Sequence, residues 1–255
     1  MRVCFYGAGG PVAAAAIRAL EKAGGFTMRL TDLNADSLAP YTDRHETMVV
    51  DVTDFEQVSA AAQGMDALVN CTVIRHDIAG AFRVNAVGAY NIMRAAVAHG
   101  VRRVVQTGPY LAQGGYMGDY AADFDIPDDA PPRPGVGDPH FGAYFLTKFL
   151  GQEICRVFAE TYDITVVVLL FVAFYDPNDE RLVAGKGVNA FCVSWDDAGE
   201  AFRCALTVPA LPRPFEVFHI LADLPHGKFT NHKAKTLLHW QPNENFARYW
   251  RRSVG

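Results

Sequence analysis

Residues 1–32 read MRVCFYGAGGPVAAAAIRALEKAGGFTMRLTD, and their pattern predicts a strand, a glycine-rich turn, a helix and a second strand. Residues 2–6 are a short apolar run. Residues 11–22 have helical spacing, with Pro11 in the first turn and Gly24-Gly25 beyond the end. Residues 27–31 are predicted to form the second strand. This order predicts a βαβ unit that opens a parallel sheet.

The turn of this unit contains three glycines, Gly7, Gly9 and Gly10. Glycine permits a tight turn and lets backbone N–H groups approach a pyrophosphate, which the N-terminus of the next helix favours electrostatically. The G-x-G-x-x-G pattern fails because Val12 stands at the third glycine position, but the spacing Gly7-x-x-Gly10-x-x-Ala13 fits. A glycine cluster alone is equally compatible with a plain strand-to-helix turn.

The second strand is followed by Asp32, about twenty residues past the turn. A carboxylate at this point can accept hydrogen bonds from both hydroxyls of an adenosine ribose, and it would repel a 2′-phosphate. Residues 33–36 contain no arginine or lysine that could attract such a phosphate. The sequence therefore predicts NAD as the cofactor in preference to NADP. The alternative is a solvated turn carboxylate.

Most of the remaining chain continues the alternation of strand and helix patterns. Further strands are predicted at residues 46–50, 67–72, 103–107 and 164–171, and helices at residues 55–63, 79–99 and 141–161. Shorter elements are predicted at residues 189–194, 196–206, 216–220, 231–238 and 243–251. The fold class is α/β, with a Rossmann-type doubly wound parallel sheet covered on both faces. We expect one domain over residues 1–255, with a dinucleotide-binding core at 1–168 and small substrate-side elements at 169–255.

Composition limits the classes of partner. The net charge of −5 offers no basic footprint for nucleic acid, so a small-molecule substrate is expected instead. No stretch resembles a membrane span, and the glycines and proline near the N-terminus break any signal-peptide pattern. The five cysteines are widely separated, as expected of reduced thiols in a cytoplasmic protein. The eight histidines are dispersed, so no metal site is predicted.

Tyr144 and Lys148 begin the long helix predicted at residues 141–161. A separation of four residues places both on one helical face, so the ammonium can lie near the phenol or near a cofactor ribose. We expect the ammonium to lower the pKa of Tyr144 below its reference value of about 10. The phenol could then act as a general base in alcohol oxidation, or as a general acid in the reverse direction. The alternative is an exposed lysine beside an interfacial tyrosine.

Taken together, these motifs resemble the extended short-chain dehydrogenase/reductase superfamily, the NAD-dependent epimerase/dehydratase group. The resemblance rests on GAGGPVA, TD, VVDVTD, VNAVGAYNI, GVRRVVQTG and AYFLTKFLGQE. Within the superfamily, SWDDAGEAF and NHKAKTLLHWQP are similar to uronate dehydrogenases, which oxidise the anomeric carbon of hexuronic acids with NAD. The resemblance implies cofactor contacts from Gly7, Gly9, Gly10, Pro11, Val12, Asp32, Asp51, Val52, Asn70, Cys71, Thr72, Tyr144 and Lys148.

The substrate half of the family pattern is altered. The catalytic serine of the family falls on Pro109, which has no hydroxyl, so Thr107 or Tyr110 is the candidate to contact the substrate oxygen. The arginine with which uronate dehydrogenases hold the substrate carboxylate falls near Leu170.

Other positions are therefore needed for the substrate carboxylate. Arg75 or Arg181 could bind it, and the alternative for Arg75 is a solvated loop charge. The fourth-strand motif of the family, usually histidine followed by small residues, reads Asn70-Cys71-Thr72-Val73 here.

The function predicted from these residues is an NAD-dependent oxidoreductase that acts on a hydroxyl or carbonyl of a small polar substrate, with a sugar or sugar acid as the candidate. Tyr144 would transfer the proton, Lys148 would orient the ribose, and Thr107 would hold the substrate oxygen. One alternative is an NAD-dependent sugar epimerase or dehydratase. Another is a non-catalytic NAD-binding sensor, because of Pro109. The resemblance further implies a homodimer through the helices at 79–99 and 141–161.

Overall fold

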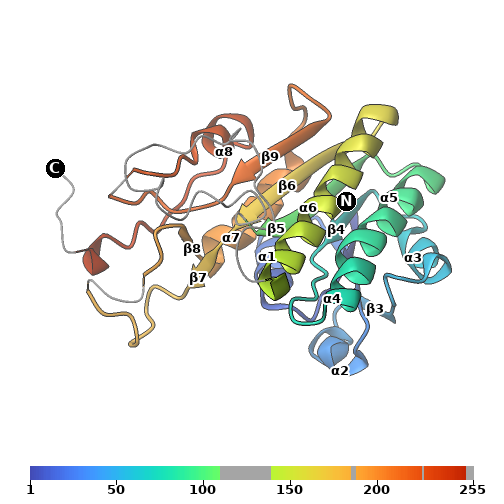
Figure 1. Ribbon diagram of the computed structural model, residues 1–255, viewed down its shortest axis with the longest axis horizontal. Helices are drawn as coiled ribbons and strands as arrows, with labels where there is room; N and C mark the ends of the chain where they lie inside the picture. The colour runs from blue at the N-terminus through green and yellow to red at the C-terminus, as the bar shows by residue number, and fades with distance from the viewer. Residues whose placement is uncertain (110–138, 185–187, 226, 251–255) are drawn as a thin grey trace.

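The computed structural model describes residues 1–109, 139–184, 188–225 and 227–250. Its centre is a parallel sheet in the order β3-β2-β1-β4-β5-β6-β9, shown in Figure 1. The strands of this sheet are β1 (Arg2–Tyr6), β2 (Thr27–Asp32), β3 (Glu46–Val49), β4 (Ala67–Asn70), β5 (Arg103–Pro109), β6 (Thr165–Phe171) and β9 (Phe215–His219). Every neighbouring pair runs parallel. The predicted doubly wound α/β fold is thus confirmed.

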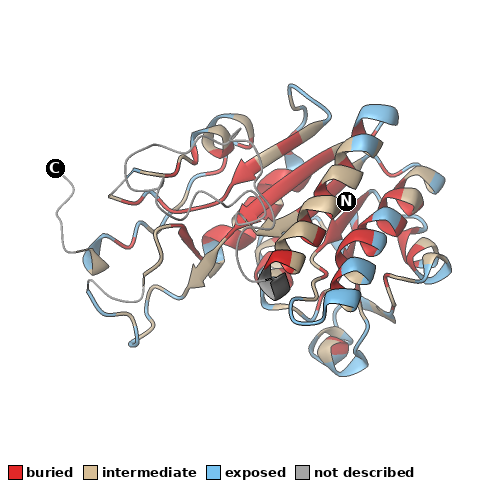
Figure 2. Cartoon of the chain, in the orientation of Figure 1, coloured by how far each residue is buried: buried red, intermediate tan, exposed pale blue. Residues whose placement is uncertain are grey.

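Helices cover both faces of the sheet. On one face lie α3 (Phe55–Ala62), α5 (Gly88–Ala98) and α6 (Pro139–Thr161), and on the other lie α1 (Pro11–Ala23) and α7 (Trp195–Thr207). The strands between them are buried, as Figure 2 shows, because each face packs against apolar helix residues. Smaller elements are α2 (Ala35–Leu38), η1 (Ala39–Tyr41), α8 (His232–Leu237) and a parallel pair, β7 (Ala173–Tyr175) with β8 (Cys192–Ser194).

The strand order places a ligand site at one edge of the sheet. The chain passes from β1 outward to β2 and β3, and then returns to β4 on the other side of β1. Ligands of open α/β sheets bind at such a switch point, outside the carboxyl ends of the strands. The turns after β1 and β4 therefore form the expected position of the site.

Helices α1 and α7 pack unusually closely because small residues face each other. A Cβ atom on Gly199 of α7 would lie only 2.4 Å from the carbonyl oxygen of Ala15 on α1. The alanine run of α1 buries Ala13, Ala15 and Ala16 in the same layer. The sequence AAAA after the glycine turn is thus explained by helix packing.

Two of the expected helices differ in the structure. The helix predicted at residues 79–99 consists of α4 (Ile78–Ala81), a π-helical segment η2 (Phe82–Val87) and α5. The helical pattern at residues 243–251 yields only a short 3₁₀ turn, η6 (Ala247–Tyr249). A helix cannot extend there because Phe246 adopts a left-handed conformation (φ 53°).

No helix among the described residues is long and apolar enough to cross a membrane.

A buried carboxylate fixes the segment that precedes η6. Asp197 is 1% exposed and accepts hydrogen bonds from Ser194 Oγ (2.8 Å) and from the backbone nitrogens of Asn243 (2.8 Å) and Glu244 (3.0 Å). Its own carbonyl accepts from Trp240 Nε1 at 2.9 Å. The motif SWDDAGEAF therefore anchors the C-terminal segment to α7.

We expect Asp197→Asn to lower the free energy of unfolding by about 2–4 kcal/mol, because an amide cannot accept all of these hydrogen bonds and must bury donors. Urea denaturation measures the change. Asp196→Asn is the matched control, since Asp196 is exposed, and it should change stability by less than about 0.5 kcal/mol. Equal effects of the two substitutions would contradict the anchoring role.

Candidate functional site

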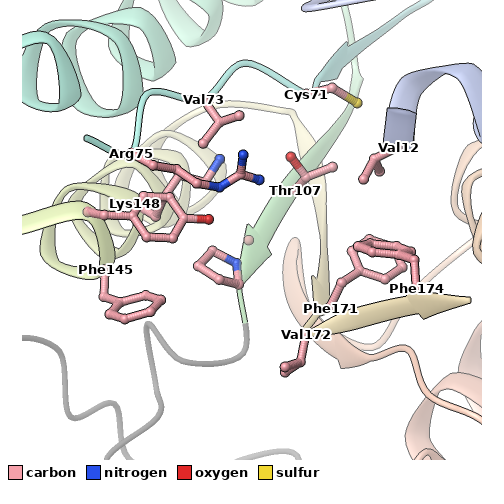
Figure 3. Close-up of a pocket in the computed structure, with 13 residues that line it drawn as sticks. Val12, Cys71, Val73, Arg75, Thr107, Phe145, Lys148, Phe171, Val172 and Phe174 are labelled. Atoms are coloured by element: carbon pink, nitrogen blue, oxygen red, sulfur yellow. The ribbon is translucent and has the colours of Figure 1, made fainter. Parts of the chain in front are cut away.

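A pocket of about 230 Å³ opens at the carboxyl edge of β1, β4, β5 and β6, beside the first turns of α6. Its volume is below the range of about 300–1,000 Å³ that is usual for drug-sized ligands. Figure 3 shows its lining, which comes from the first turn of α1, the segment after β4, the ends of β5 and β6, the first turns of α6, and β7. The lining residues are Val12, Cys71, Val73, Arg75, Thr107, Gly108, Pro109, Tyr144, Phe145, Lys148, Phe171, Val172 and Phe174.

The turn after β1 approaches the turn after β4 at backbone distance. Gly7 has a φ of 80°, and a Cβ atom on it would lie 2.9 Å from the carbonyl carbon of Cys71 and from the nitrogen of Thr72. Only glycine fits this conformation and this approach. The helix that follows begins at Pro11, and its N-cap, Gly10, supplies no side-chain cap. The first N–H groups of α1 are therefore left to bind an anion.

Asp32 lies directly beside this turn. Its Oδ2 accepts a hydrogen bond from the Gly9 nitrogen at 3.0 Å, and its Oδ1 accepts from the Asn34 nitrogen at 3.1 Å. A Cβ atom on Gly9 would lie 3.0 Å from Asp32 Oδ2 and 2.4 Å from the Ser37 Cβ, so glycine is required here by close contact. The carboxylate is thus held next to the proposed phosphate turn, as the sequence spacing predicts.

The predicted adenine-side pair, Asp51 and Val52, follows β3 at the same edge of the sheet. Val50, just before the pair, donates from its nitrogen to the Asp32 carbonyl at 3.0 Å, so the pair lies near the end of β2. The Asp51 carboxylate accepts from the Thr53 nitrogen at 2.8 Å, and Val52 is buried. Their contact with a cofactor remains a prediction.

The residues after β4 are organised by a buried amide. Asn70 donates to Gln106 Oε1 at 2.9 Å and accepts from the nitrogen (3.0 Å) and hydroxyl (2.7 Å) of Thr72. Its side chain therefore shapes the turn, and Cys71 rather than Asn70 lines the pocket. Burial raises the pKa of the Cys71 thiol to about 12, so this group is not a thiolate at neutral pH.

Lys148 is brought to the pocket by α6, one helical turn after Tyr144. Its side chain is buried, and Nζ donates to the Thr72 carbonyl at 3.3 Å. Burial lowers the pKa of this ammonium to about 8, and the nearby Arg75 guanidinium acts in the same direction. The predicted juxtaposition of Tyr144, Lys148 and the glycine turn is present in the structure.

The expected effect of Lys148 on Tyr144 was wrong in direction. The pKa of Tyr144 is raised above its ordinary value because burial disfavours the phenolate. The cation that opposes this rise, by its charge and by a hydrogen bond, is Arg75 rather than Lys148. Lys148 instead directs its ammonium to the Thr72 carbonyl.

Arg75 reaches over the pocket from the loop after β4. Its guanidinium carbon lies 5.6 Å from the centre of the Tyr144 ring, and Figure 3 shows the guanidinium directed toward Thr107. No acidic side chain in the described part of the chain forms an ion pair with it. Arg181, the other candidate for a substrate carboxylate, is 89% exposed, pairs with Asp179 at 2.6 Å and does not line the pocket.

Asn85 of the π-helical segment fixes the loop that carries Arg75. Its side chain accepts from the Ile74 nitrogen at 3.0 Å and donates to the Ile74 carbonyl at 2.9 Å. The same amide nitrogen donates to Thr147 Oγ1 at 3.0 Å, and this hydroxyl donates to the Tyr144 carbonyl at 3.0 Å. Functional sites often contain such π-helical segments, and this one links the loop to α6.

The structure also shows where the residues lie that depart from the family pattern. Pro109 ends β5 and lines the pocket, so no side-chain hydroxyl is present at that point. Thr107 lines the pocket as well, and its hydroxyl donates to the Asn70 carbonyl at 2.9 Å. Leu170 is fully buried, with its side chain against Gly108. Tyr110 lies outside the described residues.

Sequence reasoning missed the aromatic part of the lining, Phe145, Phe171 and Phe174. Two of these stand in the sequence FVAF, in which Phe171 ends β6 and Phe174 lies in β7. That pattern was visible in the sequence, but it does not by itself indicate which face carries the pocket.

Comparisons with known proteins find similarity to NAD(P)H-binding proteins and to sugar dehydrogenases. Residues 7–122 match the family model described as NAD(P)H-binding. The chain is 28% identical over 188 residues to a uronate dehydrogenase of Pseudomonas syringae pv. tomato, covering 71% of this chain and 61% of that protein. It is also 24% identical over 263 residues to an NAD-dependent glucose-6-phosphate dehydrogenase of Haloferax volcanii, covering 97% of this chain and 95% of that protein.

The fold comparison leads to the same group. The crystal structure of uronate dehydrogenase from Agrobacterium tumefaciens superposes with a TM-score of 0.78 at 22% identity, covering 97% of this chain and 86% of that chain. The match to the Pseudomonas protein spans less than two thirds of its length. The predicted nicotinamide cofactor and the resemblance to the extended short-chain dehydrogenase/reductase superfamily are confirmed.

Lys148→Met is expected to stabilise the protein without cofactor at pH 7, because the folded state no longer has to bury an ammonium. The pKa of Lys148 is about 8 in the folded chain, below its ordinary value of 10.5. The unfolded chain therefore binds more protons between these values, and the penalty disappears as the pH rises from about 8 to 10.5. We expect a gain in unfolding free energy of about 1–3 kcal/mol at pH 7 that shrinks at pH 10.

Urea denaturation at the two pH values measures the gain. Lys22→Met is the control, because Lys22 is exposed, and it should change stability little at either pH. A gain that is absent, or equal at both pH values, would show that the buried ammonium is not destabilising.

Proposed function

We propose, from this resemblance to uronate and other NAD-dependent sugar dehydrogenases, that the chain is an NAD-dependent dehydrogenase that acts on a hydroxyl or carbonyl of a small substrate. The observation that carries the proposal is the position of Tyr144 and Lys148. Both line one pocket at the carboxyl edge of the sheet, beside the turn that begins at Gly7. A dinucleotide turn and a proton-transferring phenol at one site are what hydride transfer requires.

The residues at the pocket and its edge fit a dinucleotide. The free N–H groups at the start of α1 would bind the pyrophosphate, and Asp32 would accept from the ribose hydroxyls. Among the solved structures with this fold, an Agrobacterium tumefaciens uronate dehydrogenase variant is described as complexed with NAD. Asp32, with no basic residue at 33–36, supports NAD over NADP for this chain.

The chain's own residues would move the proton. When bound, NAD supplies the hydride acceptor. Tyr144 takes the proton of a substrate hydroxyl during oxidation, or donates a proton to a carbonyl oxygen during reduction. Its raised pKa keeps the phenol protonated in the free protein, which suits the reductive direction. Oxidation requires the phenolate form of Tyr144, and the Arg75 guanidinium is the charge that opposes the effect of burial on this phenol. Thr107 lines the pocket, and because its hydroxyl proton is donated to the Asn70 carbonyl, its oxygen is left to accept a hydrogen bond from a substrate hydroxyl.

A sugar or sugar acid is the substrate class indicated by the relatives, three of which are named uronate dehydrogenases. A second candidate function is favoured by Pro109. A chain that lacks the family's serine could bind NAD as a sensor without turnover. The two functions differ in whether NADH forms.

Tyr144→Phe is expected to lower kcat by about 100-fold or more with NAD binding nearly unchanged, because the change removes only the proton-transferring oxygen. The measurement is NADH formation with a panel of sugars, sugar acids and hydroxy acids, together with NAD binding by calorimetry. Tyr162→Phe, an exposed tyrosine just after α6, is the matched control and should retain full activity. Full activity of Tyr144→Phe would refute this mechanism, and NAD binding without turnover of any compound would support the sensor.

We further propose a cytoplasmic homodimer formed through α4, η2, α5 and α6. Large apolar side chains are exposed on or directly after these helices, and such exposure in a row is typical of an interface. They are Ile78 (41% exposed), Phe82 (40%), Val87 (45%), Tyr90 (44%), Val157 (52%) and Tyr162 (48%). The five cysteines are all free, which agrees with a reducing compartment.

Val157→Glu is expected to convert the dimer to a monomer at micromolar concentration, since it would bury a charge at the interface. Sedimentation velocity measures the change. Val183→Glu, at a valine that is 55% exposed and outside these helices, should leave the dimer intact. A monomeric wild-type chain, or a dimeric Val157→Glu variant, would reject the interface.

A further inference from the structure

The described wall of the pocket is mostly apolar. Its polar side chains, Arg75, Thr107, Tyr144 and Lys148, are few, and each already has a partner. The Arg75 guanidinium hydrogen-bonds the Tyr144 phenol. The Thr107 hydroxyl donates to the Asn70 carbonyl, and the Lys148 ammonium donates to the Thr72 carbonyl. The apolar lining residues are Val12, Val73, Pro109, Phe145, Phe171, Val172 and Phe174.

The aromatic side of this wall is a packed column. The rings of Phe171 and Phe174 lie 5.0 Å apart, and Phe174 stacks on Trp195 at 4.5 Å with an interplanar angle of 11°. Phe171 also stacks on Phe202, at 6.1 Å. Because each ring is supported by the next, the column presents a fixed apolar surface to the pocket.

A polyhydroxylated ring fits this wall poorly. Each hydroxyl that is buried without a partner costs about 1–3 kcal/mol. The position at which a uronate carboxylate would be held is Leu170, which is buried against Gly108. An aromatic or branched aliphatic group, by contrast, gains free energy by burial against Phe171 and Phe174.

Arg75 sets the distance between the anionic group and the reacting carbon. Its guanidinium lies beside the Tyr144 phenol, with the guanidinium carbon 5.6 Å from the ring centre. A carboxylate bound by Arg75 must therefore be close to a carbinol whose oxygen contacts Tyr144. One or two carbons satisfy this spacing, which describes a short hydroxy acid.

We propose that the pocket selects a short 2- or 3-hydroxy acid, or the matching oxo acid, that carries an apolar branch. Arg75 holds the carboxylate, and Phe171 with Phe174 holds the branch. On oxidation the carbinol C–H breaks and its hydride passes to NAD⁺. The O–H proton passes to the phenolate form of Tyr144, and the products are an oxo acid, NADH and the neutral phenol, which returns its proton to solvent. This inference rests on the proposed dehydrogenase, and it assigns to it a short hydroxy acid in place of the sugar or sugar acid that the relatives indicate.

The experiment compares three alcohols on the full chain with NAD. They are 3-hydroxy-3-phenylpropanoate, the neutral 1-phenylethanol, and D-glucuronate. We expect kcat/KM for the hydroxy acid to exceed that for glucuronate by at least about 10-fold. A preference for glucuronate would overturn the inference and leave the dehydrogenase intact.

Binding without turnover separates the inference from the proposed function. In the Tyr144→Phe variant saturated with NAD, calorimetry should still detect 3-hydroxy-3-phenylpropanoate. Adding Arg75→Met should weaken this binding by about 30-fold or more, because a charge-assisted pair is lost. Arg83→Met, at an exposed arginine of η2, is the control and should leave the binding unchanged.

Two further results complete the test. Phe174→Ser should weaken binding of the phenyl compound by about 10-fold, and unaltered thermal unfolding would show that the variant folds. If neither Arg75→Met nor Phe174→Ser changes the affinity for the hydroxy acid, the inference is overturned. Arg75-dependent binding without NADH formation in the wild-type chain would uphold the inference and refute the dehydrogenase.

Discussion

The site depends on one close approach, that of the backbone at Gly7 to the backbone at Cys71 and Thr72. A Cβ atom on Gly7 would lie 2.9 Å from both segments, so no other residue permits the contact. The approach brings the start of α1 beside the turn after β4. The carbonyl of Thr72 in that turn accepts a hydrogen bond from the ammonium of Lys148, one helical turn after Tyr144 on α6. The glycine turn and the helix that carries Tyr144 are thus connected through the turn after β4.

The sequence predicts the framework well because the framework follows from periodic patterns. β1 has the predicted bounds, and the glycine turn, Asp32 and the Tyr144–Lys148 helix lie where their spacing places them. Patterns of this kind report local structure and the order of parallel strands. They do not report how long-range contacts override helical spacing. Asn85, whose amide bonds the Ile74 backbone, lies in a π-helical segment of a helix predicted as regular.

Electrostatics were predicted less well, because they depend on burial and on neighbours distant in sequence. Lys148 stands one turn from Tyr144, yet it is Arg75, from a loop after another strand, that opposes the burial of the phenol. The family position for a carboxylate-binding arginine is Leu170, and the side chain there turns into the core, while the next residue, Phe171, faces the pocket. The proposed cofactor contacts and the proposed substrate contacts therefore have separate determinants. The first lie at the turns along the sheet edge, and the second are side chains that differ from the family pattern.

The amide of Asn85, which does not line the pocket, connects two segments that do. It ties the backbone next to Arg75 to the hydroxyl of Thr147, and so to the turn of α6 that carries Tyr144. Two groups from distant parts of the chain are thereby held in one relation before any ligand arrives. The entropy of ordering them is lost during folding rather than during binding, so less of the interaction energy with a ligand is consumed in bringing charge and phenol together. In this chain the irregular stretch of a helix is what joins the loop of Arg75 to the helical turn of Tyr144.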